Sequence, residues 1–169
     1  LFGNYCKLYG GSRPKIKTDD NRSIDFGAAR HEGDEQSWQG VPHDLICYDE
    51  LSQFTEYQYK YLQTWLRTVE KGQRTRIVGA TNPPTSVEGE WVIKRWAAWL
   101  DPTHPNPAKA GELRWYVTDP EGKDMEVPDD KPIYFPGRAT PSLPKSRTFI
   151  PGKVSDNPYL GSDYVATLD

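Results

Sequence analysis

The sequence predicts an α/β fold with a mainly parallel sheet flanked by helices, because strand, helix and strand patterns follow one another within residues 45–80. An apolar run over 45–48 indicates the first strand, a capped amphipathic segment over 55–72 the helix, and a β-branched segment over 74–80 the second strand. Strands joined through a helix pair in parallel. The right-handed crossover then places the ends of both strands at one edge of the sheet.

The first strand is the run Leu45-Ile46-Cys47-Tyr48, which follows the turn-prone Pro42-His43-Asp44 and ends in Asp49 and Glu50. Four apolar residues predict a buried strand, in which Cys47 serves as a small apolar residue. A buried charge needs a cationic partner, so two adjacent carboxylates at this end suggest a metal site or a proton-transfer task. The alternative is a strand that runs into an acidic helix start.

The helix is predicted to begin at Thr55, because Thr55-x-x-Gln58 is a capping-box pattern, and to end at Gly72 as a left-handed cap. Its apolar residues fall on one face at helical spacing. They are Tyr57, Tyr61, Leu62, Trp65, Leu66 and Val69.

The second strand runs into the small-residue turn Ala80-Thr81-Asn82-Pro83-Pro84. Since parallel strands end at the same edge, we expect Asp49, Glu50, Thr81 and Asn82 to converge. The alternative is an ordinary strand exit capped by Asn-Pro.

The remaining segments are predicted from alternation, turn residues and proline content. They are an exposed polar loop over 10–22, a half-buried strand over 23–29, a helix over 91–100 stopped by Asp101-Pro102, a hairpin over 113–127, an extended crossing over 128–158 and one further strand over 147–150.

Composition limits the class of protein. A chain of 169 residues predicts one domain, and 15 Pro and 14 Gly predict much loop. The net charge of -3 gives no global attraction to nucleic acid. Two cysteines make no disulfide scaffold and favour a reducing intracellular setting, and no stretch reaches the ~20 apolar residues of a membrane span. Starting on Leu1 and ending on Asp169, the chain reads as a fragment cut at both ends.

In nucleoside triphosphate hydrolysis, an Asp at a strand end holds Mg²⁺ and an adjacent Glu deprotonates the attacking water. Asp49 and Glu50 fit these roles, and the Thr81-Asn82 turn could contact the γ-phosphate. The phosphate-binding loop G-x-x-x-x-G-K-[ST] is absent. The segment 10–15, Gly-Gly-Ser-Arg-Pro-Lys, lacks a glycine before its lysine and a Ser or Thr after it, so we interpret it as a surface loop. The three histidines show no metal-ligand spacing.

Several motifs follow one another in a specific order. They are Ile24-Asp25-Phe26-Gly27, His31-Glu32, Trp38-Gln39-Gly40, His43-Asp44-Leu45-Ile46-Cys47-Tyr48-Asp49-Glu50, Ala80-Thr81-Asn82-Pro83-Pro84 and Glu88-Gly89-Glu90-Trp91-Val92. This order resembles the ATPase domain of tailed-phage terminase large subunits over roughly residues 1–160. The apolar-Asp-Glu string is common to many ATPases, and the Trp-Gln-Gly element before it and the Ala-Thr-Asn-Pro turn after it make the resemblance more specific.

The resemblance implies an incomplete P-loop NTPase-like (ASCE-type) fold with a lid-like hairpin and helix region, and ATP and Mg²⁺ as cofactors. Asp49 would be the Walker B magnesium ligand, Glu50 the catalytic glutamate and Ala80-Thr81-Asn82 the coupling motif. Residues 1–160 would be a partial ATPase domain without its Walker A strand, and residues 161–169 the start of a linker toward an absent nuclease domain. We therefore expect an exposed sheet edge and little or no ATP hydrolysis by this chain alone.

The resemblance also implies partners: double-stranded DNA, the portal protein, the terminase small subunit and further copies of the chain in a homo-oligomeric ring, with no membrane. The location would be the host bacterial cytoplasm, transiently on the procapsid portal. The family's trans-acting arginine cannot be assigned, because neither Arg30 nor Arg95 lies in an identifying motif. Two alternatives stay open: a helicase-type translocase, and a non-catalytic nucleic-acid- or protein-binding module in which Asp49 and Glu50 cap a strand.

Overall fold

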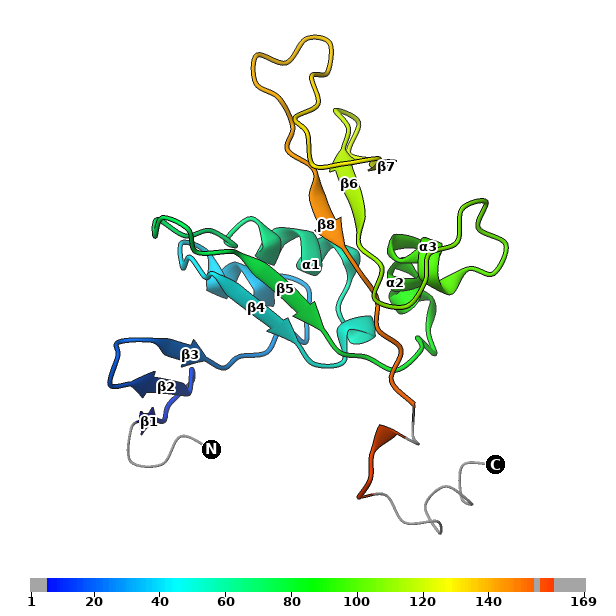
Figure 1. Cartoon of the computed structure of the whole chain (residues 1–169). Coiled ribbons are helices and arrows are strands. Elements are labelled where there is room, and N and C mark those ends of the chain that lie inside the picture. Colours follow the sequence, from blue (N-terminus) through cyan, green and yellow to red (C-terminus); the bar gives the residue numbers. More distant parts are fainter. Residues whose placement is uncertain (1–5, 154–155, 160–169) are drawn as a thin grey trace. The chain divides into compact units, whose positions relative to one another are not determined.

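The computed structural model describes residues 6–153 and 156–159. The chain divides after Val92 into two compact units, and each is described by itself (Figure 1). The first unit contains β1 (Cys6–Tyr9), β2 (Lys15–Thr18), β3 (Ser23–Asp25), η2 (Asp34–Trp38), β4 (Leu45–Tyr48), η3 (Leu51–Gln53), α1 (Glu56–Gln63), β5 (Arg76–Gly79) and η4 (Val87–Gly89). Then come α2 (Glu90–Arg95), α3 (Ala97–Leu100), β6 (Arg114–Thr118), β7 (Asp124–Val127) and β8 (Lys145–Arg147).

The fold is mixed α/β, as predicted, but the prediction of a mainly parallel sheet is wrong. The described residues form one parallel pair, β4-β5, and two three-stranded antiparallel sheets with the orders β1-β2-β3 and β7-β6-β8. Antiparallel strands close through short turns, whereas parallel strands need a crossover. Gly11 at φ +113° lies in the turn between β1 and β2, and Gly122 at φ +86° lies in the turn between β6 and β7. Among the described antiparallel strands, only β8 joins its sheet from a distant segment, by pairing with β6.

The predicted strand, helix and strand unit is present. β4 and β5 pair in parallel, from Leu45 opposite Arg76 to Tyr48 opposite Gly79. Helix α1 lies between them in sequence, and its capping box has both bonds: the Gln58 N–H donates to the Thr55 hydroxyl at 3.1 Å, and the Thr55 N–H to the Gln58 side chain at 3.0 Å.

Helix α1 ends at Gln63, so the predicted extent to residue 72 and the predicted apolar face are wrong. Tyr57 is 58% exposed, whereas Tyr59 is buried. The chain leaves the helix because it pairs with residue 43: the His43 N–H donates to the Trp65 carbonyl at 3.0 Å, and the Arg67 N–H donates to the His43 carbonyl at 2.8 Å. These long-range bonds outweigh local helix propensity.

The segment 10–22, predicted to be a loop, contains strand β2, which lies between β1 and β3. Its sequence Lys-Ile-Lys-Thr has one apolar residue in four positions, which is too short a pattern to predict a strand. The predicted strand over 23–29 is shorter and ends at Asp25.

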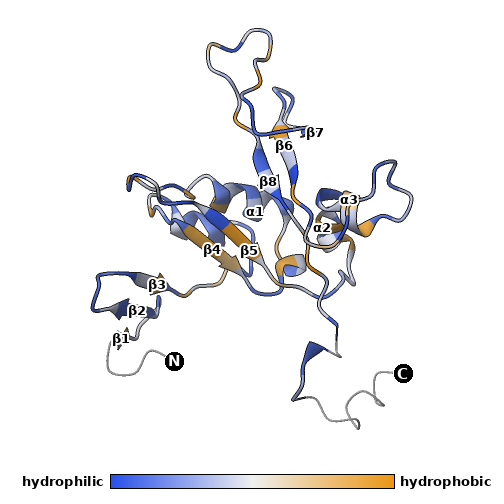
Figure 2. Cartoon of the chain, viewed as in Figure 1, coloured by the Kyte–Doolittle hydropathy of each residue, from blue (hydrophilic) through white to orange (hydrophobic). Residues whose placement is uncertain are grey.

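Strand β4 is apolar but only partly buried, which corrects the prediction of a buried strand. Tyr48 is buried, whereas Leu45 is 49% exposed and Cys47 is exposed. Successive side chains of a strand point to opposite faces. Ile46 and Tyr48 share the face that contacts Tyr59 of α1, and Leu45 and Cys47 lie on the other face. Figure 2 shows the hydrophobic colouring of β4 and β5.

In the second unit, the single helix predicted over 91–100 is two helices, because Trp96 (φ −110°, ψ 28°) interrupts the helical backbone between α2 and α3. Its indole N–H donates to the Thr148 carbonyl at 3.0 Å. The predicted hairpin is present as β6 and β7, and the further strand begins earlier than predicted, as β8. The stop after Leu100 is as predicted.

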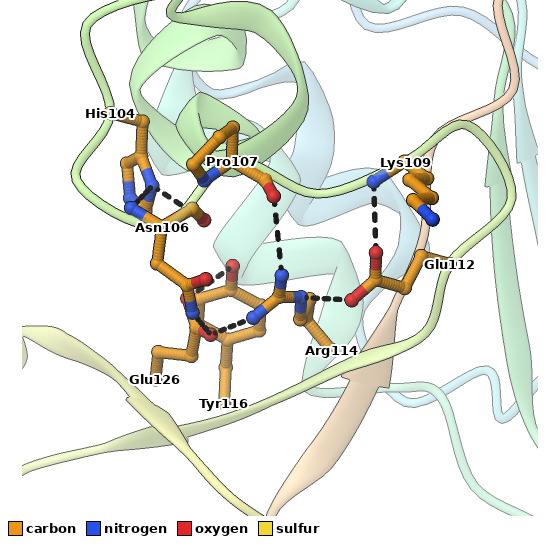
Figure 3. Close-up of polar contacts among 8 residues, drawn as sticks. All are labelled: His104, Asn106, Pro107, Lys109, Glu112, Arg114, Tyr116 and Glu126. Atoms are coloured by element: carbon orange, nitrogen blue, oxygen red, sulfur yellow. Dashed lines mark hydrogen bonds and ion pairs between the residues drawn. The ribbon is translucent and has the colours of Figure 1, made fainter.

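Two ionic clusters hold this unit together. The Asp124 carboxylate lies 2.8 Å from Arg95 and 2.7 Å from Arg147. In the second cluster, the Arg114 guanidinium lies 2.7 Å from Glu112 and 2.8 Å from Glu126 (Figure 3). These bonds fix the hairpin to its flanking segments.

Candidate functional site at the ends of β4 and β5

An aromatic cluster fixes the point at which β4 ends. The ring of Tyr48 lies edge-on to Phe54 with centroids 5.1 Å apart, and it contacts Tyr59 at 5.5 Å. Tyr59 in turn contacts Trp91 at 5.0 Å, and the Trp91 indole N–H donates to the Phe54 carbonyl at 2.8 Å. Burial raises the pKa of Tyr48. The acidic residues that follow therefore leave the sheet next to a buried, packed side chain.

The turns after β4 and β5 are joined by hydrogen bonds. The Ala80 N–H donates to the Tyr48 carbonyl at 2.9 Å, and the Leu51 N–H donates to the Ala80 carbonyl at 3.0 Å. The Ser52 N–H donates to the Thr81 hydroxyl at 3.2 Å, and the two hydroxyl oxygens lie 2.8 Å apart. The structure thus brings the Asp49-Glu50 turn and the Ala80-Thr81 turn together.

Glu50 has a left-handed backbone, with φ 51° and ψ 54°. This conformation costs a non-glycine residue roughly 1–2 kcal/mol. Glu50 is half-buried and stands at the N-cap position of η3, but its side chain makes no capping hydrogen bond. Strained backbone of this kind concentrates at functional sites. A helix-capping role does not account for this glutamate.

Asp49 is exposed and lines an open groove of about 1830 Å³, together with Val78 and Ala80. Within the described ranges, no group of three or more His, Cys, Asp or Glu side chains could enclose a metal. Mg²⁺ needs no such group, since it takes one or two carboxylates and completes its shell with water and phosphate oxygens. The single exposed carboxylate of Asp49 therefore fits Mg²⁺ that arrives with a nucleotide.

Thr81 and Asn82 are exposed at the same edge. The Thr81 hydroxyl lies 2.9 Å from the Asn82 carbonyl as well as beside Ser52. Both side chains are small, polar and accessible, so they can hydrogen-bond an anionic group that lies over the strand ends.

The other candidate segments are structural. The segment from Gly10 to Pro14 forms the turn between β1 and β2 and leads into a strand, whereas a phosphate-binding loop leads into a helix. Arg95 belongs to the Asp124 cluster, and its side chain is 9% exposed. Arg30 is exposed.

Two contributors to the site were missed by sequence reasoning. Ser52 links the two turns, and Gly89 gives that loop room, because a Cβ at Gly89 would lie 2.7 Å from the Ser52 carbonyl oxygen. A polar residue just beyond the acidic pair was the available signal for Ser52. Gly89 owes its role to a contact distant in sequence, which no local pattern encodes.

Comparison with known protein families places the chain in one of them. Residues 10–168 match the family model described as terminase large subunit, T4-like virus type, N-terminal. No curated protein and no solved structure matches the chain. None of the described helices is both long and apolar enough to cross a bilayer. Since the match covers most of the sequence, the chain belongs to the terminase large subunit family of the T4-like virus type, as part of its N-terminal region, which implies a role in phage DNA packaging.

Proposed function

We propose that this chain is the ATPase core of a viral DNA-packaging terminase, which hydrolyses ATP to move double-stranded DNA into the procapsid. The observation that carries the proposal is the acidic strand end, with Glu50 in a left-handed backbone and the adjoining loop hydrogen-bonded to the Ala80-Thr81 turn. Family membership supports it. ATP and Mg²⁺ are the cofactors that the site and the family imply.

Asp49 is the proposed magnesium ligand, because its carboxylate is exposed beside the groove at the end of β4. Bound Mg²⁺ would neutralise charge on the phosphate oxygens. Glu50 is the proposed general base. Its side chain is half-buried, and the residue that follows it, Leu51, donates its N–H to the Ala80 carbonyl.

Thr81 and Asn82 are proposed to sense the γ-phosphate and pass its loss to the rest of the unit. The bond from the Ser52 N–H to the Thr81 hydroxyl connects the sensing turn directly to the loop that follows Glu50. A shift of Thr81 therefore acts on the backbone next to the general base.

The larger assembly is part of the same proposal. The fold would be an incomplete P-loop NTPase of the ASCE type, with residues 1–160 as the partial ATPase domain and 161–169 as the start of a linker. The parent protein would also be a nuclease and would act with the portal, the small subunit and further copies in a ring, in the host cytoplasm. Because none of the described segments forms a phosphate-binding loop, we expect this chain alone to hydrolyse ATP poorly or not at all.

The test is DNA-stimulated ATP hydrolysis by the intact large subunit, comparing the wild type with Glu50→Gln. Loss of a general base is expected to lower turnover about a hundred- to ten-thousand-fold while nucleotide binding is retained. Glu56→Gln is the matched control, since it makes the same change on the surface of α1, six residues away. Unchanged turnover in Glu50→Gln would refute the catalytic assignment and favour a binding module.

A second motor domain in the intact protein, in place of a nuclease, would favour a helicase-type translocase. The Glu50→Gln result is expected to be the same for both enzymes. Measuring metal-dependent DNA cleavage alongside ATP hydrolysis separates them.

A further inference from the structure

The three-stranded sheet β1-β2-β3 has two chemically different faces. Directly opposed residues of antiparallel strands share a face, and each strand alternates between faces. The register places Lys7 opposite Lys17 and Tyr9 opposite Lys15. One face therefore carries three lysines and a tyrosine, together with Ser23 and Asp25 of β3. The other carries Cys6, Leu8, Ile16, Thr18 and Ile24.

The lysine face holds an excess of positive charge. Like charges that are directly opposed destabilise a sheet, and Lys7 and Lys17 are so placed and exposed. Asp25 is the one acidic residue in these strands, and its carboxylate forms an ion pair with Lys15 at 2.9 Å. The Lys17 ammonium lies 5.9 Å from the centre of the Tyr9 ring, which holds it over this face.

Protection against edge-to-edge aggregation does not explain the two lysines of the central strand. Proteins place lysine on edge strands for that purpose. Lys15 and Lys17 belong to β2, which is the central strand of the sheet and is paired on both sides. Lys15 is balanced by its ion pair with Asp25, whereas Lys17 adds positive charge to this face, even though the whole chain carries a net charge of -3.

We propose that the lysine face of β1 and β2 binds the phosphate backbone of double-stranded DNA. Neighbouring strands lie about 4.8 Å apart, so the directly opposed Lys7 and Lys17 place two ammonium groups close together, beside the Lys15–Asp25 ion pair. Two such groups can contact roughly two phosphates of a duplex. Contacts of this kind carry no sequence information, as movement along DNA requires.

This inference rests on the proposed function, which requires contact with duplex DNA, but it is tested without ATP. Binding of the 169-residue chain to a fluorescent duplex is measured by anisotropy between 50 and 200 mM KCl. The Lys7→Gln/Lys17→Gln variant is expected to bind about a hundredfold more weakly at 50 mM, roughly tenfold for each lost phosphate contact. The slope of log K against log salt should fall in magnitude by about 1.8.

Two further variants serve as controls. Lys71→Gln/Lys123→Gln removes the same charge from exposed positions outside this sheet and is expected to bind like the wild type. Lys7→Arg/Lys17→Arg keeps the charge and should retain binding, which separates lost contacts from misfolding.

Three results would overturn the proposal: no duplex binding by the wild type at 50 mM KCl, equal weakening by both glutamine variants, or a polyglutamate peptide that binds the wild type more tightly than a duplex of equal charge. The last would assign the face to an acidic protein segment. None of these three binding results bears on the ATPase assignment, which depends on the Glu50→Gln result.

Discussion

Replacing Glu50 by glycine and by alanine tests whether the left-handed backbone stores strain. Both changes remove the carboxylate, but only glycine adopts φ 51°, ψ 54° without steric cost. The left-handed conformation costs a residue with a Cβ roughly 1–2 kcal/mol, and glycine loses roughly 0.5–1 kcal/mol through unfolded-state entropy. Glu50→Gly should therefore be more stable than Glu50→Ala by about 0.5–1 kcal/mol.

Urea denaturation, followed by circular dichroism, measures this difference as a shift in the midpoint at equal slope. Glu56 is the matched control, because it lies in the first turn of α1 with ordinary helical geometry. There the order should reverse, with alanine more stable than glycine by about 1 kcal/mol. An alanine variant at position 50 that equals or exceeds the glycine variant would refute the reasoning.

Three further changes test the packing around the site and in the second unit. Tyr48→Phe should leave the free energy of unfolding unchanged or raise it by up to about 1 kcal/mol, as measured by chemical denaturation. The reason is that the Tyr48 hydroxyl is buried and has no hydrogen-bond partner among the described residues. Gly89→Ala should lower the melting temperature, because the added Cβ would lie 2.7 Å from the Ser52 carbonyl oxygen. Moving the backbone to remove this clash costs about 1–3 kcal/mol. An unchanged melting temperature would contradict the close contact. Burial disfavours the charged form of Asp124, but Arg95 and Arg147 outweigh burial and lower the pKa of this carboxyl in the folded state. The charged carboxylate therefore contributes its full stabilisation above the unfolded-state pKa of about 3.9, and this stabilisation is lost as the pH falls through the lower folded-state pKa. Asp124→Asn should cost about 3 kcal/mol at pH 7 and flatten the acid limb of stability against pH; a parallel acid limb would contradict this linkage.

Local patterns predicted the elements whose bonds are local. The capping box at Thr55 and Gln58 and the hairpin of β6 and β7 involve residues a few positions apart, and both are present. Parallel pairing followed from the connection length, because a strand, a helix and a strand leave one favoured geometry.

Elements that depend on distant contacts were predicted poorly. The end of α1 is set by the pairing of Trp65 and Arg67 with His43, which lies more than twenty positions earlier. Strand β2 forms because it pairs with β1 and β3 on its two sides, and its own four residues carry little strand signal. At the candidate site, the acidic turn and its partner turn were predicted, but the left-handed backbone of Glu50 was not, since glutamate carries no preference for it.

The Thr81 hydroxyl has one proton and two acceptors within reach, the Ser52 hydroxyl oxygen at 2.8 Å and the Asn82 carbonyl at 2.9 Å. Rotation about the Cβ–Oγ bond moves the proton between them, while the Ser52 N–H continues to donate to the same oxygen. A third acceptor over the strand ends, such as a phosphate oxygen, therefore competes only for that proton. The Ser52 N–H bond joins the turns after β4 and β5 whether or not that proton is engaged, so in the proposed ATPase a bound phosphate would reorient the hydroxyl without separating the two turns.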